Sequence, residues 1–132
     1  HTFYLKGNTM SPATSTTANS HDTVHSDCLA NAKPDLFELG QTVCTTALDG
    51  WAQARLPTAL LEGNLWLLIL VKAHVTGCWE HMYKEDRELN YRSLETDNEG
   101  RIFSAFTILD EKIYVITEWD RSVTTVMLAS DY

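Results

Sequence analysis

The residues with the clearest chemical potential lie together in the decapeptide ITEWDRSVTT, residues 116–125. The decapeptide places a glutamate, an aspartate and an arginine beside four hydroxyl side chains, between two runs of β-forming residues. Arg121 can form a bidentate pair with a carboxylate such as that of Glu118. Asp120 can instead accept hydrogen bonds from the backbone two residues further on, as aspartates in tight turns do. The decapeptide is therefore either a functional site or the polar turn of a β-hairpin with an internal ion pair, and the residues favour the turn.

The functional interpretation joins the decapeptide to basic side chains elsewhere in the chain. Arg121, Arg101 and His74 would form an anion-binding cluster, with Glu118 beside it. Hydroxyl groups would donate hydrogen bonds to the anion, from Ser122, Thr124 and Thr125. Ser122 could also act as a nucleophile with His74 as its base and Asp120 or Glu118 as orienter. Because no nucleophile elbow or oxyanion-hole glycine accompanies these residues, we assign no catalytic residue.

Two groups of histidine and cysteine have the residue types of a metal site. These are His21, His25 and Cys28 in HDTVHSDC, and His74, Cys78 and His81 in HVTGCWEH. A zinc site normally needs four ligands, or three ligands and a water. The first group lies in a polar segment and the second straddles a glycine, so structural histidines and an inert thiol are the better interpretation. We expect neither a metal nor another cofactor.

Acidic residues dominate the C-terminal half of the chain. The 132 residues carry a formal net charge of −8, and the stretch from Cys78 to Tyr132 holds 12 acidic and 6 basic residues. A surface of this sign repels phosphate backbones, so direct nucleic-acid binding is not expected. It can attract a basic protein surface, or imitate DNA towards a DNA-binding protein. The alternative is that the acidity only keeps the protein soluble.

Cysteine spacing and hydropathy bear on where the protein resides. Cys28, Cys44 and Cys78 lie 16 and 34 residues apart, which matches neither a zinc ribbon nor a redox motif. Reduced thiols in a cytoplasm are therefore expected. The longest unbroken apolar run, Leu65–Val71, has seven residues, whereas a membrane span needs about 20. The first residues also lack the basic and apolar regions of a signal peptide, so we predict a cytoplasmic protein without a membrane span.

The chain divides into a tail and one domain. Residues 1–34 include SPATSTTANSHDT, which is rich in small and polar residues and has little to bury, so this segment is expected to be a flexible tail. Residues 1–9 precede the first methionine and are either a vector remnant or an upstream extension. Residues 35–132 are expected to form a single α+β domain.

Helix signals occupy the first part of this domain. A short helix is expected from Thr46 to Ala54, before Pro57 stops it. The segment Leu60–Val75 is apolar on all sides, so as a helix it must be buried or lie at a subunit interface, which makes a homo-oligomer a secondary prediction. Within it, Leu65–Val71 also has the composition of a strand, and periodicity does not decide between the two.

The last third of the chain has the pattern of a β-meander that follows a polar helix over residues 83–94. The three expected strands are residues 101–108, 112–119 and 123–129. Both faces of the meander are partly apolar, so helices should cover one face and the tail or a second chain the other. The expected fold is α+β, with two or three helices packed on a C-terminal three-stranded antiparallel sheet. Trp79 and Trp119 are expected in its core, with the lining of a pocket as the alternative.

Several motifs in His74–Tyr132 follow one pattern. The pattern is His-Val-x-Gly-Asp-Trp-Gly, an acidic helix with Asp and Asn, Arg-x-x-Ser-Ala-Tyr, Ile-Thr-Glu-x-Asp-Arg-Ser-x-Thr-Thr, and a final Glu-Tyr or Asp-Tyr. With these motifs the chain resembles a family of small uncharacterised proteins carried by plasmids, phages and other mobile genetic elements. The matching positions are Leu39, Gly40, His74, Gly77, Trp79, Asp86, Asn90, Arg101, Ser104, Thr117, Glu118, Asp120, Arg121, Ser122, Thr124, Thr125 and Tyr132.

The chain departs from this pattern at three positions. Cys78 replaces the usual Asp, Glu80 replaces Gly and Phe106 replaces Tyr, so chemistry that needs the aspartate is not carried over. The resemblance implies a genomic setting, in which accessory tasks such as interference with host defence are common. We therefore expect a non-enzymatic mobile-element accessory protein that binds another protein, such as a host defence or DNA-binding protein, through its acidic half. The alternative is a small-ligand or anion-binding protein, or an enzyme, centred on Arg121, Glu118 and His74.

Overall fold

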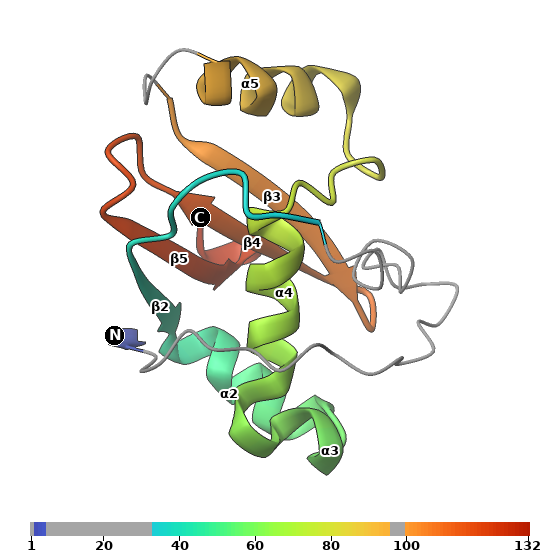
Figure 1. The fold of residues 1–132 in the computed structure, drawn as a ribbon. Coiled ribbons are helices and arrows are strands. Elements are labelled where there is room, and N and C mark those ends of the chain that lie inside the picture. The colour runs from blue at the N-terminus through green and yellow to red at the C-terminus, as the bar shows by residue number, and fades with distance from the viewer. Residues whose placement is uncertain (1, 5–32, 96–99) are drawn as a thin grey trace.

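The computed structural model describes residues 2–4, 33–95 and 100–132 and has the expected α+β class (Figure 1). Its helices are α2 (Thr46–Arg55), α3 (Thr58–Leu61), α4 (Leu65–Val75) and α5 (Lys84–Glu95), with short 3-10 turns η1 (Glu62–Asn64) and η2 (Ala129–Asp131). Its strands are β1 (Thr2–Tyr4), β2 (Gln41–Thr45), β3 (Ile102–Ile108), β4 (Glu111–Thr117) and β5 (Val123–Leu128). The three predicted strands and the polar helix are therefore present.

The sheet is larger than the predicted three-stranded antiparallel meander. Its strand order is β1-β2-β5-β4-β3, and β2 pairs with β5 in parallel, which makes the sheet mixed. The antiparallel pairs β3–β4 and β4–β5 follow the prediction. The expected sheet was wrong because β2 is a five-residue strand whose partner lies about 80 residues further along the chain, so no local turn signal marks the pairing.

Within the predicted tail, β1 pairs antiparallel with β2 on the outer side of the sheet. The rest of that segment, through residue 32, lies outside the described residues. The domain that follows begins with an extended segment in which Leu36 N donates to Val75 O at 2.9 Å. This contact fastens the segment to the end of α4.

Helix α2 begins one residue after strand β2 ends, and Thr45 makes the transition. The Thr45 hydroxyl accepts a hydrogen bond from Leu48 N at 3.3 Å, which caps the helix and shifts the cap one residue ahead of the predicted Thr46. Further on, Gly63 and Asn64 have φ values of 62° and 56°, and these left-handed residues separate α3 from α4. The ambiguous run Leu65–Val71 is helical and forms most of α4.

Helix α4 crosses one face of the sheet and supplies much of the core (Figure 1). Core residues come from β2, α2, α4 and the three C-terminal strands, and they include Cys44, Leu48, Leu67, Leu70, Phe106, Ile113, Val115 and Val126. One helical stretch in the described residues, Thr58–Val75, has the length and apolarity of a membrane span, but 44% of it is buried inside the fold. Core helices of soluble proteins share these properties, so this stretch is weak evidence for a membrane.

Helix α5 protects the edge of the sheet at β3. The Asn90 side chain donates to Phe103 O at 2.7 Å and accepts from Phe103 N at 2.9 Å, as a neighbouring strand would. His81 Nε2 donates to Ala105 O at 2.5 Å on the same edge. Trp79 is fully buried in a second core cluster under this helix, as expected. An edge covered in this way does not invite pairing with a strand of another chain.

Two sequence expectations about single residues are wrong. Trp119 was expected in the core, but it follows β4 and is 60% exposed because the strand ends at Thr117 and the chain turns before the indole can reach the interior. Cys78 was expected to be a reduced thiol, but it is disulfide-bonded. Cys44 is a buried free thiol, and burial raises its pKa to about 12, with a smaller contribution from Asp49.

Candidate functional site

The decapeptide forms the turn between β4 and β5, as its composition predicted. Glu118 N donates to Val123 O at 3.0 Å, and Arg121 N donates to Glu118 O at 2.9 Å. Asp120 Oδ1 accepts from Ser122 Oγ at 2.6 Å and from Ser122 N at 3.1 Å. These two hydrogen bonds lower the pKa of Asp120, which is exposed and negatively charged at neutral pH. Asp120 therefore satisfies its own turn.

Gly40 packs directly against the backbone of the β4–β5 turn. Gln41 N donates to Ser122 O at 2.9 Å, which brings the start of β2 against the turn. Gly40 has a φ of +63°, and a Cβ at this position would collide with the carbonyl oxygens of Arg121 and Ser122. Only glycine combines this backbone conformation with so close an approach.

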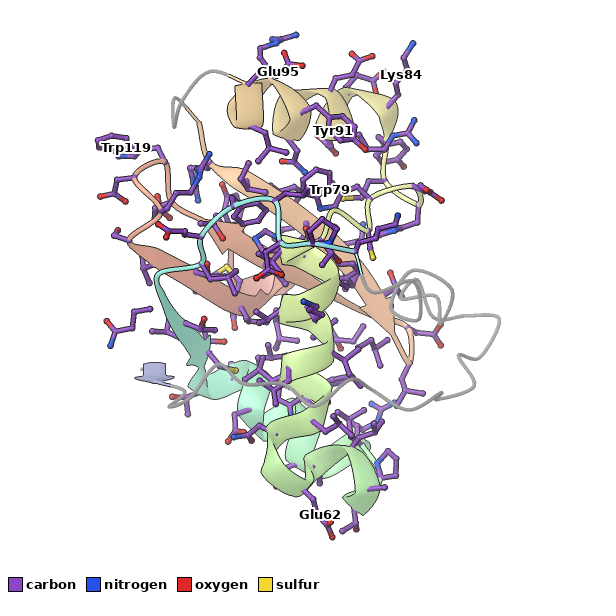
Figure 2. The ribbon with its side chains drawn as sticks, viewed as in Figure 1. Glu62, Trp79, Lys84, Tyr91, Glu95 and Trp119 are labelled. Atoms are coloured by element: carbon purple, nitrogen blue, oxygen red, sulfur yellow. The ribbon has the colours of Figure 1, made fainter. Side chains whose placement is uncertain are left out.

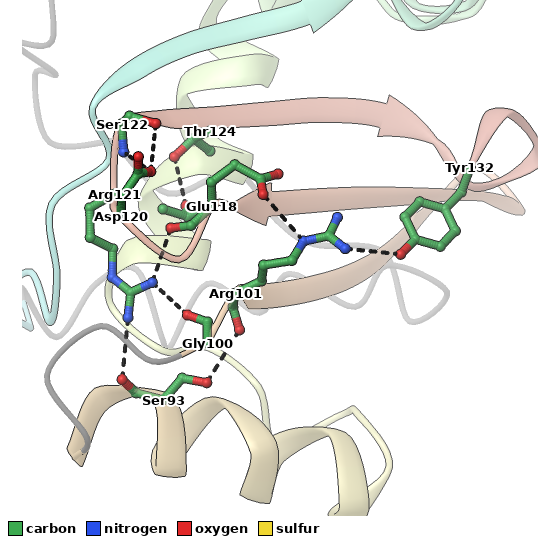
Figure 3. A network of polar contacts seen from close by, with 10 residues as sticks. Ser93, Gly100, Arg101, Glu118, Asp120, Arg121, Ser122, Thr124 and Tyr132 are labelled. Carbon is green, nitrogen blue, oxygen red and sulfur yellow. Dashed lines mark hydrogen bonds and ion pairs between the residues drawn. The ribbon is translucent and has the colours of Figure 1, made fainter.

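The side chain of Arg121 lies under the turn and binds backbone carbonyls (Figure 3). Its Nη1 donates to Gly100 O at 2.7 Å and to Glu118 O at 3.1 Å, and its Nη2 donates to Ser93 O at 3.3 Å. Only 8% of Arg121 is exposed, and its guanidinium lies over the Phe37 ring at 5.8 Å from the centroid. Burial lowers its pKa, but an arginine stays charged at neutral pH.

These contacts correct the expected ion pair within the turn. Arg121 was expected to bind a carboxylate of Glu118 or Asp120, but its hydrogen bonds among the described residues go to carbonyl oxygens instead. The reason is that its side chain points inward, between the turn, the start of β3 and the end of α5. Arg121 therefore joins three segments of backbone, and most of its donors are already used.

His74 lies in the core at the centre of a chain of polar side chains. Its Nδ1 is 2.6 Å from Ser104 Oγ, and its Nε2 is 2.8 Å from Thr117 Oγ1. Trp79 Nε1 donates to the same Ser104 hydroxyl at 2.7 Å. On the other side, Thr117 Oγ1 is 2.6 Å from Thr124 Oγ1, which donates to a backbone carbonyl, Leu39 O, at 2.7 Å. Every side chain in this network has a partner.

The two ends of the network determine the direction of each hydrogen bond. Because Thr124 donates to a carbonyl, its oxygen must accept from the Thr117 hydroxyl, whose oxygen in turn accepts from His74 Nε2–H. With Nε2 protonated, the Nδ1 of a neutral imidazole accepts from the Ser104 hydroxyl. Burial first, and the charge of Arg121 second, lower the pKa of His74 to about 3. The histidine is therefore neutral, with its proton on Nε2.

Arg101 and Glu118 lie on the outer surface of the sheet. Arg101 Nε is 3.6 Å from Glu118 Oε1, and Arg101 Nη1 donates to Tyr132 Oη at 3.4 Å (Figure 3). The guanidinium also lies over the Tyr132 ring, 6.0 Å from its centroid. Tyr132 packs edge-on against Tyr114. Trp119 follows Glu118 in the chain and is exposed, and we call it together with Arg101, Tyr114, Glu118 and Tyr132 the Trp119 surface.

The residues of the predicted anion-binding cluster lie in three separate places in the structure. His74 and Thr124 are in the core, Arg121 is under the turn, and Arg101 is on the surface. Ser122 is exposed and bound to Asp120, whereas Thr125 is half-buried on the opposite side of β5 from Thr124. Ser122 is not a hydrogen-bond partner of His74, whose two ring nitrogens contact other residues.

Sequence reasoning missed the residues that complete the polar network, Ser104 and Thr117. Both occupy inward positions of strands whose neighbouring inward residues are apolar, such as Ile102 and Phe106. A hydroxyl at such a position needs a buried partner, which is the signal that could have found them. For metals, no group of three or more potential ligands occurs in residues 2–4, 33–95 and 100–132. His21, His25 and Cys28 lie outside those ranges.

Comparison with known proteins returns no relative. No family model, no curated protein and no solved structure matches the chain. What the protein does is therefore inferred from its own surface and its own buried groups.

Proposed function

We propose that this protein is a non-enzymatic accessory protein of a mobile genetic element and that it binds a basic protein surface through the Trp119 surface. The exposure of two aromatic side chains carries the proposal. Trp119 is 60% exposed and follows Glu118 in the chain, and Tyr132 is 69% exposed and contacts Arg101 (Figure 3). Tryptophan, tyrosine and arginine are the residues that contribute most to binding energy at protein interfaces.

The charge around this surface supports a basic partner. Glu118, Asp120 and Asp131 are acidic residues on or next to it, and the last two are exposed. They belong to a chain with a net charge of −8. Complementary charge accelerates the encounter between two proteins, whereas apolar contacts slow their separation. A DNA-binding host protein, whose binding face is basic, is the partner class that suits an acidic surface.

The mobile-element setting comes from the sequence resemblance. Its most specific positions, in Glu118 to Thr125, lie in the β4–β5 turn and its support, together with Gly40. Asp120, Arg121, Ser122 and Thr124 in this range hold the fold, whereas Glu118 belongs to the Trp119 surface. The resemblance is therefore support for a common scaffold, and the function proposed here depends on the surface residues beside it.

The contacts of the candidate residues argue against the anion-binding or enzymatic alternative. The donors of Arg121 are engaged by three carbonyls, and the two nitrogens of His74 are engaged by Ser104 and Thr117. An anion would have to displace these buried partners, each at a cost of about 1–3 kcal/mol. The surface interpretation needs no such rearrangement.

Affinity capture from a host lysate with matched variants tests the proposal. The wild-type chain should retain a basic protein at low salt, and Trp119→Ala should lose at least about tenfold of that binding. Tyr83→Ala is the control, because Tyr83 is 79% exposed but lies ahead of α5, away from the Trp119 surface. High salt should weaken capture by the wild type and by the control alike. Equal capture by Trp119→Ala and Tyr83→Ala would contradict the proposed surface.

A further inference from the structure

The end of the molecule opposite α5 carries apolar side chains that the core only partly covers. This end is formed by α2, α3 and the first turns of α4 (Figure 1). Leu65 and Leu68 lie three residues apart on one side of α4 and are only partly buried, as are Leu60 and Leu61 of α3, which pack against the core. The other side of α4 is buried in the core. We call Leu60, Leu61, Leu65 and Leu68 the leucine surface.

The leucine surface bears no charge of its own. From Leu65 to Val71 helix α4 contains no ionisable side chain, in a chain whose net charge is −8. A helix that is apolar on all sides lowers its free energy when both sides are covered. A strongly basic partner would gain nothing from this uncharged stretch.

Two exposed residues of opposite charge border the leucine surface along the chain. Arg55 ends α2, and Glu62 follows α3 at the tip of the molecule (Figure 2). Among the described residues, neither forms an ion pair within the chain. A partner surface with charges of a single sign would pair with only one of these two residues. A second copy of the chain, related by a two-fold axis, would satisfy both, because each copy offers one positive and one negative group.

We propose that the leucine surface is a homodimer interface, in which Arg55 of each chain pairs with Glu62 of the other. Helix α5, which has Glu85 and Asp86 in its first turn, lies at the far end of the molecule (Figure 1). Joining two copies at their leucine surfaces keeps these helices apart, and repulsion between them is screened beyond about 8–10 Å at physiological salt. The dimer carries two copies of the Trp119 surface, so a partner with two basic sites would be held by avidity. This interface does not depend on the proposed function.

Sedimentation analysis of the full chain over a wide concentration range tests the interface. The wild type should show a concentration-dependent mass approaching that of two chains. Leu68→Glu should raise the dissociation constant at least about tenfold, because it puts a charge in the centre of an apolar contact. The control is Leu109→Glu, a change at a leucine that is 40% exposed at the tip of the β3–β4 hairpin. It should leave the dimer unchanged.

A charge swap identifies the partner as a second copy. Arg55→Glu and Glu62→Arg should each weaken the dimer by about three- to fivefold, and the double variant should restore it, because both pairs are then re-formed with reversed sign. The two positions are exposed, so these variants remain informative even where Leu68→Glu does not fold. A monomeric wild type at the highest concentration, or a double variant as weak as the single ones, would overturn the proposal. So would wild-type co-sedimentation with phosphatidylcholine vesicles that Leu68→Glu abolishes, since the surface would then bind lipid.

Discussion

His74 is held neutral inside the core by partners on both ring nitrogens. The chain from Trp79 through Ser104 and His74 to Thr117 and Thr124 satisfies every donor in turn. Buried polar groups are tolerated when each has its partner and are costly when one is lost. The network is therefore structural, and it connects α4 with three strands of the sheet.

The pKa of His74 predicts a loss of stability in acid. Its folded value is about 3, below the ordinary 6.5, so the unfolded chain binds a proton more readily than the folded one. The free energy of unfolding should be unaffected by this group above pH 6.5 and should fall by about 1.4 kcal/mol per pH unit between 6.5 and 3. Urea unfolding at several pH values measures this slope. NMR of the imidazole gives an independent check, since its shifts should stay constant down to about pH 4, and titration near 6.5 would contradict the network.

The guanidinium of Arg121 predicts a large effect of a conservative substitution. Arg121→Lys keeps the charge and the left-handed backbone but loses the planar fork that reaches three carbonyls. Unfolding in urea should show a loss of about 2–3 kcal/mol. Arg101→Lys is the matched control, because its ion pair is exposed and should contribute less than about 1 kcal/mol. Equal effects at both positions would refute the structural role of Arg121.

The β4–β5 turn and strand β2 stabilise one another at the scale of elements. Gln41 N donates to Ser122 O, and β2 continues from there in parallel with β5. Gly40 lies at the junction, where the two segments are in contact. The turn therefore depends on a segment about 80 residues earlier in the chain.

Gly40→Ala should destabilise the fold, because alanine at a φ of +63° is strained and its Cβ meets two carbonyl oxygens. We expect a loss above about 2 kcal/mol in thermal or urea unfolding. Gly50→Ala serves as the control, since Gly50 lies within α2 and a Cβ there meets nothing within 4 Å. That change should stabilise by about 0.5–1 kcal/mol. A Gly40→Ala variant as stable as the wild type would exclude the close approach.

Sequence patterns predicted the elements with strong local signals and missed one that lacks them. The three C-terminal strands, helix α5 and the turn at Asp120 follow from alternation, charge spacing and turn chemistry within a few residues. Strand β2 carries no such signal, and its place in the sheet, between β1 and β5, depends on its pairing with β5. The sequence did not give the relative positions of the candidate site residues for the same reason, because the direction of Arg121 depends on carbonyls of other elements and that of His74 on hydroxyl groups of two strands.

The distribution of charge acts at the scale of the whole molecule. With a net charge of −8, the protein would attract the proposed basic partner over distances at which no individual contact is formed. Raising the salt concentration should therefore lower the association rate of a captured partner and leave its dissociation rate nearly constant. Trp119→Ala should instead raise the dissociation rate and leave the association rate nearly constant. Surface plasmon resonance separates the two rates, and a salt effect confined to dissociation would contradict long-range attraction.

The sequence by itself determined the α+β class, the net negative charge, the hairpin turn and the alternation of the C-terminal strands. These properties depend on local propensity or on composition, which do not need distant partners. Only the tertiary structure decided that β2 joins the sheet, that Arg121 binds carbonyls, that His74 is buried and that Trp119 is exposed. Each of these outcomes depends on contacts between segments that are distant in the sequence, and only the packing of the whole chain determines those contacts.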